Sequence, residues 1–143
     1  MLRRIVLDTN CLIQSISRRS PYYRIWSEFI AERYLLCVTT EILEEYAEIL
    51  AGHLSPSVAE LVIAAILRAN NTVRVDAQFR FRLIEADPDD NKFVDCAIVS
   101  NAEYIVTNDA HFDCLADIPF PHVNVRNIDE FLEELLEMDA GES

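Results

Sequence analysis

Polar side chains follow two apolar runs of the chain at the point where each run stops. The segment RRIVLDTN ends on Asp8, Thr9 and Asn10, and the later segment YIVTND ends on Asn108 and Asp109. Turn formation accounts for one such ending, because Asp and Asn side chains close turns and cap helices. Two similar endings, after strands expected to share one parallel sheet, indicate a common site, since ligands bind beyond the carboxyl ends of such strands.

Further acidic positions are candidates for the same edge of the sheet. Asp95 lies on the predicted helix that leads into YIVTND, two residues before the apolar Ala97. In the helix that follows the second predicted strand, Glu44 and Glu45 flank the apolar stripe of residues 42–50 on either side. Periodicity alone does not choose between these two glutamates.

Carboxylates that share one pocket repel one another, and each is driven toward its protonated form unless a cation compensates the charge. Their oxygens are hard ligands, which suit Mg²⁺ or Mn²⁺, and these ions also accept phosphate oxygens. The acids therefore predict phosphoryl chemistry assisted by Mg²⁺ or Mn²⁺, with one or two ions. The sequence places no histidine pair or serine elbow as a competing nucleophile.

The elements that must position these acids alternate along the chain. Short runs rich in Val, Ile and Leu predict strands, and apolar residues at helical spacing predict helices between them. The predicted strands are residues 5–7, 35–38, 72–75, 104–107 and 123–125, and the predicted helices cover residues 21–33, 41–50, 55–67, 93–98 and 128–138. This alternation predicts the α/β class, as a three-layer α/β/α sandwich with a central parallel sheet of four to five strands.

The length of 143 residues and the hydrophobic content of 51% suit one domain with one core. We expect that domain over residues 1–138 and a disordered acidic tail over residues 139–143. No apolar run approaches the roughly 18 residues that span a bilayer, and the first residues lack a signal-peptide pattern, so we expect a cytoplasmic protein. The four cysteines and three histidines show no metal-ligand spacing.

The formal net charge of -13 is concentrated in the second part of the chain, where Arg126 is the one basic residue after Lys92. Phosphate contacts normally come from basic patches, so nucleic-acid binding requires a local positive field. Arg18 and Arg19 follow the Asp8 turn, and Lys92 precedes Asp95. These three residues are the candidate substrate contacts, with a purely solvated role as the alternative for each arginine.

Two other classes of α/β protein with acids at strand ends are excluded. A phosphotransfer receiver domain needs a lysine at a strand end, whereas Lys92 is the only lysine and precedes a helix. Phosphatases of the haloacid dehalogenase type need Asp-x-Asp after the first strand, whereas Asn10 occupies the third place.

Three segments in their order along the chain resemble the PIN domain family of the toxin-antitoxin (VapC-like) type. They are VLDTN, TTEILEEYAEIL and DPDDNKFVDCAIVSNAEYIVTNDAHF, and the resemblance runs from Leu2 to about Phe131. It implies a parallel sheet between helices and a divalent-metal ribonuclease that hydrolyses phosphodiester bonds to leave 5′-phosphate and 3′-hydroxyl ends.

The resemblance also implies roles for individual residues. Carried over by position, the catalytic and metal-binding acids are Asp8, Glu45, Asp95 and Asp109, which selects Glu45 over Glu44. Asp90 joins as a further metal ligand from the turn. The side chains implied to hold the carboxylates in place are those of Thr9, Asn10, Asn91, Thr107 and Asn108.

The family resemblance implies RNA as substrate and, as partner, an antitoxin protein with a basic end that binds the acidic pocket. Toxin dimers are common in the family, so a homodimer is also expected. Two alternatives remain open, which are a PIN-like scaffold that binds RNA or protein without cutting and a housekeeping nuclease that processes RNA.

Overall fold

The computed structural model describes residues 2–142 and contains one five-stranded sheet. Its strands are β1 (Arg4–Leu7), β2 (Leu35–Val38), β3 (Thr72–Arg74), β4 (Tyr104–Val106) and β5 (Val125–Arg126). They lie in the order β3-β2-β1-β4-β5, and every neighbouring pair is parallel. The predicted parallel α/β sheet is confirmed.

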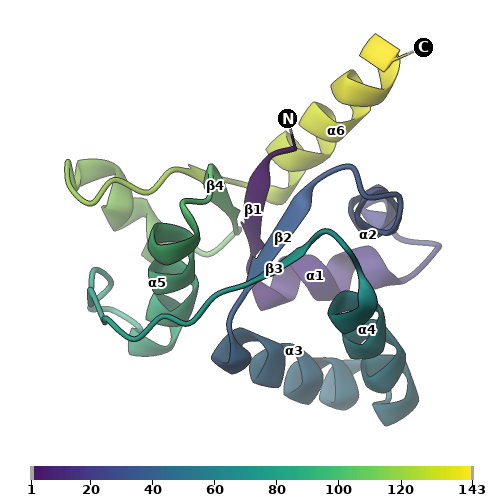
Figure 1. Ribbon diagram of the computed structural model, residues 1–143, viewed down its shortest axis with the longest axis horizontal. Coiled ribbons are helices and arrows are strands. Elements are labelled where there is room, and N and C mark those ends of the chain that lie inside the picture. Colours follow the sequence, from purple (N-terminus) through teal and green to yellow (C-terminus); the bar gives the residue numbers. More distant parts are fainter. Residues whose placement is uncertain (1, 143) are drawn as a thin grey trace.

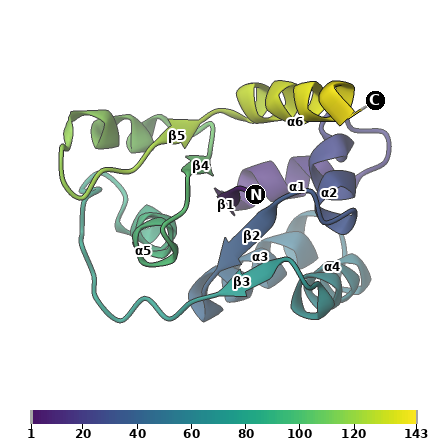
Figure 2. The same cartoon turned by 45° about the horizontal axis from the view of Figure 1, so that its top comes forward.

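Helices cover both faces of this sheet (Figure 1). They are α1 (Thr9–Ile16), α2 (Tyr23–Ile30), α3 (Thr40–His53), α4 (Pro56–Arg68), α5 (Asn91–Ser100) and α6 (Ile128–Glu142), with the 3₁₀ helices η1 (Pro88–Asp90) and η2 (Ala110–Asp117). Figure 2 shows α5 on the opposite side of β1 and β2 from α1 and α2. Right-handed crossovers place these helices on opposite faces of the sheet. The chain first moves from β1 toward β3, and it then returns past β1 to β4 in the other direction.

The core lies on both sides of the central strand. Ile5, Val6 and Leu7 of β1 are all buried, since helices cover both faces of a parallel sheet. Local sequence sets the starts of the two helices that follow β2. The side chain of Thr39 accepts a hydrogen bond from the backbone N–H of Ile42, and Ser55 caps α4 in the same way.

The strand order reverses between β1 and β4, and this point positions the site. Leu7 pairs with Val106, so the carboxyl ends of the two strands lie level with each other. Asp8 and Thr107 are therefore neighbours at the edge where open α/β sheets bind their ligands.

The structure contains η2, which was not predicted, and differs from the predicted elements most clearly in three other places. Helix α1 begins at Thr9, directly after the first strand, and was not predicted. Strand β5 occupies residues 125–126, one residue later than the end of the predicted strand.

The third difference concerns the end of the chain, where a disordered tail is expected from residue 139. In the structure helix α6 extends to Glu142, and its Asp139 forms ion pairs with Arg24 and Arg33 of the first half of the chain. The expectation for residue 143 lies outside the described residues. Within residues 2–142, no helix combines the length and the apolar character needed to cross a bilayer.

Candidate active site

Asp8 is held at the end of β1 by its neighbour strand. Its backbone N–H donates to the carbonyl of Val106 at 2.9 Å, and its Oδ2 accepts a hydrogen bond of 2.7 Å from the hydroxyl of Thr107. Asp8 as a whole is only 7% exposed. Asp8 is thus fixed at the reversal point of the sheet.

Glu45 reaches the same place from α3. The hydroxyl of the buried Tyr46 donates to the Leu7 carbonyl at 2.6 Å, which ties α3 to the end of β1 and sets Glu45 beside α1. The two carboxylate oxygens of Glu45 then accept hydrogen bonds from Thr9 Oγ1 and, at 2.6 Å, from Lys92 Nζ. Lys92 therefore contacts an acid of the site.

Asp109 and Asp90 meet at His111. The Asp109 carboxylate accepts the backbone N–H of His111 at 2.9 Å, while the His111 ring Nδ1 lies 3.3 Å from Asp90 Oδ2 and 3.4 Å from Asp109 Oδ1. Asp87 joins this group, because Asp87, Asp90 and His111 each offer a ligand atom within 4.8 Å of the others.

The charges of four acids act on one another. Burial raises the pKa of Asp8, the hydrogen bond from Thr107 lowers it, and the negative charges of Glu45 and Asp109 raise it further. Burial also raises the pKa of Asp90 to about 6, assisted by the charges of Asp109, Asp87 and Asp8 and opposed by the contact with His111. We call Asp8, Glu45, Asp90 and Asp109 the acidic cluster.

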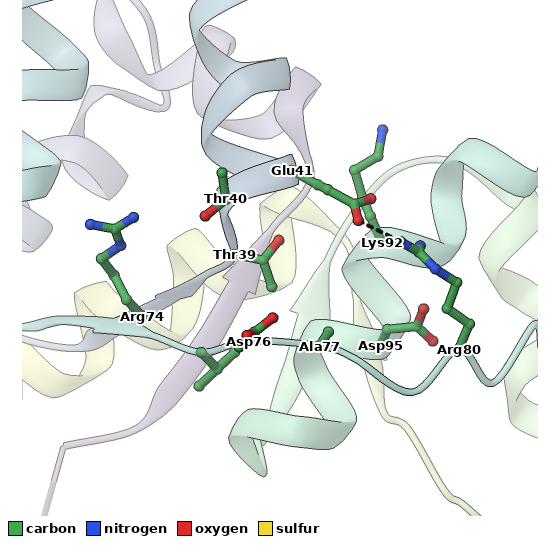
Figure 3. Close-up of a pocket in the computed structure, with 10 residues that line it drawn as sticks. Thr39, Thr40, Glu41, Arg74, Asp76, Ala77, Arg80, Lys92 and Asp95 are labelled. Atoms are coloured by element: carbon green, nitrogen blue, oxygen red, sulfur yellow. Dashed lines mark hydrogen bonds and ion pairs between the residues drawn. The ribbon is translucent and has the colours of Figure 1, made fainter.

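Asp95 binds the loop that carries Phe81. It is 2% exposed, and its Oδ1 accepts a hydrogen bond of 3.1 Å from the backbone N–H of Phe81. Burial raises its pKa, and the charged groups that act on it are Arg80 and Glu41, with no member of the acidic cluster among the causes. Figure 3 shows Asp95 and Arg80 at the same end of a cavity of about 350 Å³, which Lys92 also lines.

The predicted supporting residues divide into two groups. Thr9 and Thr107 donate directly to carboxylates of the acidic cluster. Asn91 instead holds the backbone N–H and carbonyl of Ile84, and Asn108 accepts the backbone N–H of Ile128. Asn10 is exposed on the first turn of α1.

Arg18 and Arg19 lie beyond the far end of α1. This helix begins next to Asp8 and has eight residues, so it extends about 12 Å away from the acidic cluster. An RNA strand would have to follow the whole helix to meet both the arginines and the acids.

The sequence reasoning did not assign Asp87 and His111 to the site. The signal for Asp87 is the DPDD turn, whose first carboxylate caps η1 by accepting the backbone N–H of Asp89. His111 lies two positions after Asp109, at the start of η2. At this spacing its ring Nδ1 lies 3.4 Å from Asp109 Oδ1.

The donor set of this site suits a divalent cation. The acidic cluster offers carboxylate oxygens, and the group of Asp87, Asp90 and His111 adds an imidazole nitrogen. Burial and the charges of neighbouring acids disfavour the ionised forms of Asp8 and Asp90. A cation bound among these acids would offset that unfavourable electrostatic energy.

The hydrogen bond from Tyr46 provides a test of how α3 is positioned. We expect Tyr46→Phe to lower the free energy of unfolding by about 1 kcal/mol, because one buried hydrogen bond is lost. Tyr34→Phe is the matched control, since the buried Tyr34 hydroxyl donates to the Ile25 carbonyl at 2.7 Å, away from the acids. Urea denaturation should give similar losses for both variants, while only Tyr46→Phe should weaken divalent-ion binding. Equal ion binding in both would show that the bond does not position Glu45.

Comparison with known proteins gives a match to a family and a fold. A family model described as PIN domain matches residues 4–111. A search of curated proteins finds no match. Among solved structures, VapBC2 from Rickettsia felis bound to a DNA fragment from its promoter aligns with a TM-score of 0.59 and 17% identity, covering 87% of this chain and 98% of that chain. DNA-bound VapBC from Salmonella typhimurium aligns with a TM-score of 0.57 and 18% identity, covering 90% of this chain and 99% of that chain.

Proposed function

The chain belongs to the PIN domain family, and from that premise we propose that it is a divalent-metal-dependent endoribonuclease that acts as the toxin of a toxin-antitoxin pair. PIN domains are generally nucleases, which hydrolyse phosphodiester bonds. RNA as substrate, the metal requirement and a cytoplasmic location are parts of this proposal.

One observation supports the proposal most directly. Asp8, Asp90 and Asp109 come from three separate segments of the chain near the carboxyl ends of β1 and β4. The charge of Asp109 raises the pKa of Asp8, and the charges of Asp109 and Asp8 raise the pKa of Asp90. Buried acids that repel one another lower the stability of the folded protein. Such a group of acids is expected where a bound ligand compensates their charge.

In this proposal the acidic cluster would hold one or two Mg²⁺ or Mn²⁺ ions. Such an ion would supply Lewis-acid chemistry to a phosphodiester and to the attacking water. The Thr107 hydroxyl orients Asp8 and lowers its pKa against the larger effect of burial, because a donor to a carboxylate favours its charged form. Thr9 and Lys92 orient Glu45 through hydrogen bonds to its two carboxylate oxygens.

We propose Asp90 as the third acid of the site, and Asp95 as a positioning residue. Asp90 lies in the field of Asp8 and Asp109, whereas Asp95 holds the backbone of Phe81. This departs from the assignment implied by family resemblance, in which Asp95 is catalytic and Asp90 assists.

The proposed partner is an antitoxin with a basic segment, and a homodimer is proposed with it. The similar solved structures are described as VapBC bound to DNA. A cavity of about 790 Å³ next to Asp109 is also lined by Asp113, Asp129 and Glu130, so its charge suits arginine or lysine side chains.

Incubating the protein with a mixed RNA pool tests the activity. We expect cleavage with Mg²⁺ or Mn²⁺ and none with a chelator, because without a cation the acids repel the phosphodiester. The cleaved ends should carry 5′-phosphate, measured by ligation to an adaptor. Cleavage that persists in the chelator would contradict the metal requirement, and RNA binding without any cleavage would favour the scaffold alternative.

A further inference from the structure

Aromatic and basic side chains alternate in the loop between β3 and η1, as Phe79, Arg80, Phe81 and Arg82. We call these four residues the aromatic-arginine loop. The rings of Phe79 and Phe81 meet edge to face, with centroids 4.6 Å apart. Phe79 is 66% exposed, so a large flat apolar surface faces solvent while its partner ring supports it from the protein side.

Contacts with α5 fix this loop beside the acidic cluster. Asp95 accepts the backbone N–H of Phe81, and Asn91 binds both backbone groups of Ile84 at 2.9 and 2.8 Å. Asn91 directly follows Asp90 of the cluster. The loop is therefore attached to helix α5, which begins directly after Asp90.

The positive charge near the acids lies on the side of this loop. The cavity in Figure 3 is lined by Arg74, Arg80 and Lys92 and by the acids Glu41, Asp76 and Asp95, so its charges balance. Arg80 pairs with Glu41 at 2.8 Å, and Lys92 contacts Glu45 of the acidic cluster. On the other side of the cluster, the cavity next to Asp109 has Arg126 and several acids in its lining. A polyanion that reaches the acidic cluster is thus favoured to approach along the aromatic-arginine loop.

The combination of aromatic rings and guanidinium groups indicates which kind of polyanion the loop would bind. An exposed phenylalanine alone suits many partners, including another protein. Aromatic rings interleaved with arginines match single-stranded nucleic acid, whose bases stack on rings while its phosphates meet the cations. A duplex does not fit in the same way, because its base faces are already stacked inside the helix.

We infer that the aromatic-arginine loop is a stacking platform for unpaired bases of the substrate. This inference rests on the proposed ribonuclease function and adds a substrate-binding surface to it. Phe79 carries the stacking surface, Phe81 supports it, and Arg80 and Arg82 face the phosphates of the strand.

Binding measurements with uncleaved RNA test the platform. Asp109→Asn serves as the background so that Mg²⁺ can be present without cleavage, and a short RNA containing 2-aminopurine is compared with its duplex. In this background we expect Phe79→Ala to weaken single-stranded binding about 5- to 100-fold and to remove the fluorescence quenching that stacking causes. Phe79→Trp should keep both. Phe120→Ala is the matched control, because Phe120 is 89% exposed outside the loop, and it should change neither.

Three outcomes would overturn the platform. The first is equal affinity for the single strand and the duplex. The second is a loss of RNA affinity caused by Arg18→Ala with Arg19→Ala but not by Phe79→Ala. The third is an effect of Phe79→Ala only on self-association, measured by sedimentation. Cleavage by the otherwise unchanged protein separates the two proposals. If the protein cleaves RNA and Phe79→Ala does not change the rate, the stacking platform is contradicted and the nuclease function stands. If RNA binding depends on Phe79 but no cleavage is detected, the nuclease function is contradicted and the platform stands.

Discussion

We expect Asp8→Asn to reduce RNA cleavage by about three orders of magnitude or more. Asp8 lies at the reversal point of the sheet and is only 7% exposed, so its charge acts on the site with little screening by water. A cation that stabilises a phosphoryl transition state contributes several kcal/mol, and about 1.4 kcal/mol corresponds to a tenfold change in rate. Single-turnover cleavage at saturating Mg²⁺ measures the loss.

The same substitution should stabilise the metal-free protein. Burial and the charges of Glu45 and Asp109 disfavour ionised Asp8, so a neutral amide of the same shape relieves that cost. We expect a higher melting temperature for Asp8→Asn in a chelator and a smaller increase when Mg²⁺ is added. Glu48→Gln removes the same charge from an exposed position on α3 and should change neither activity nor the response to Mg²⁺. A destabilised Asp8→Asn protein would instead indicate a structural role for the carboxylate.

The second large effect separates Asp90 from Asp95. We expect Asp90→Asn to lower cleavage at least a hundredfold and Asp95→Asn to keep most of it. The amide oxygen of an asparagine at position 95 can still accept the N–H of Phe81, which is the contact that Asp95 makes. Asp95→Ala removes the acceptor and should raise KM for single-stranded RNA more than it lowers kcat. If Asp95→Asn is as inactive as Asp90→Asn, then Asp95 is a catalytic acid after all.

The pH dependence of stability gives Asp90 a second readout. Its pKa rises in the folded protein from 3.8 to about 6, so the folded state binds this proton more tightly than the unfolded state does. Stability from this group is therefore complete below about pH 4 and is lost as the pH rises through 6. In a chelator, the melting temperature of Asp90→Asn should fall less across this interval. An identical fall in both proteins would assign the effect to other groups.

Most of the fold could be predicted from the sequence because the strands are buried on both faces. Their continuous apolar runs at residues 5–7 and 35–38 appear in the structure within one residue. Helix α1 could not be predicted in the same way, since it starts on the polar residues Thr9 and Asn10 that also suit a turn.

The direction of Asp95 was beyond pattern reasoning for a related reason. Five successive residues of α5, from Phe93 to Ala97, are buried, so the pattern around Asp95 does not distinguish a solvent face from a core face. Its direction depends on the loop that carries Phe81, which periodicity does not describe. Asp8 and Asp109 could be predicted because they lie at or just beyond the ends of two apolar strands. Glu45 was selected over Glu44 only through the family resemblance.

The central position of β1 affects when the site can assemble during synthesis. Asp8 is synthesised before Thr107, which holds it and is separated from it by 99 positions along the chain. Strand β4 must be made and inserted beside β1 before the acids can meet. In the proposed ribonuclease, a nascent polypeptide would therefore spare nearby transcripts, including its own message, until β4 has been made and has folded against β1.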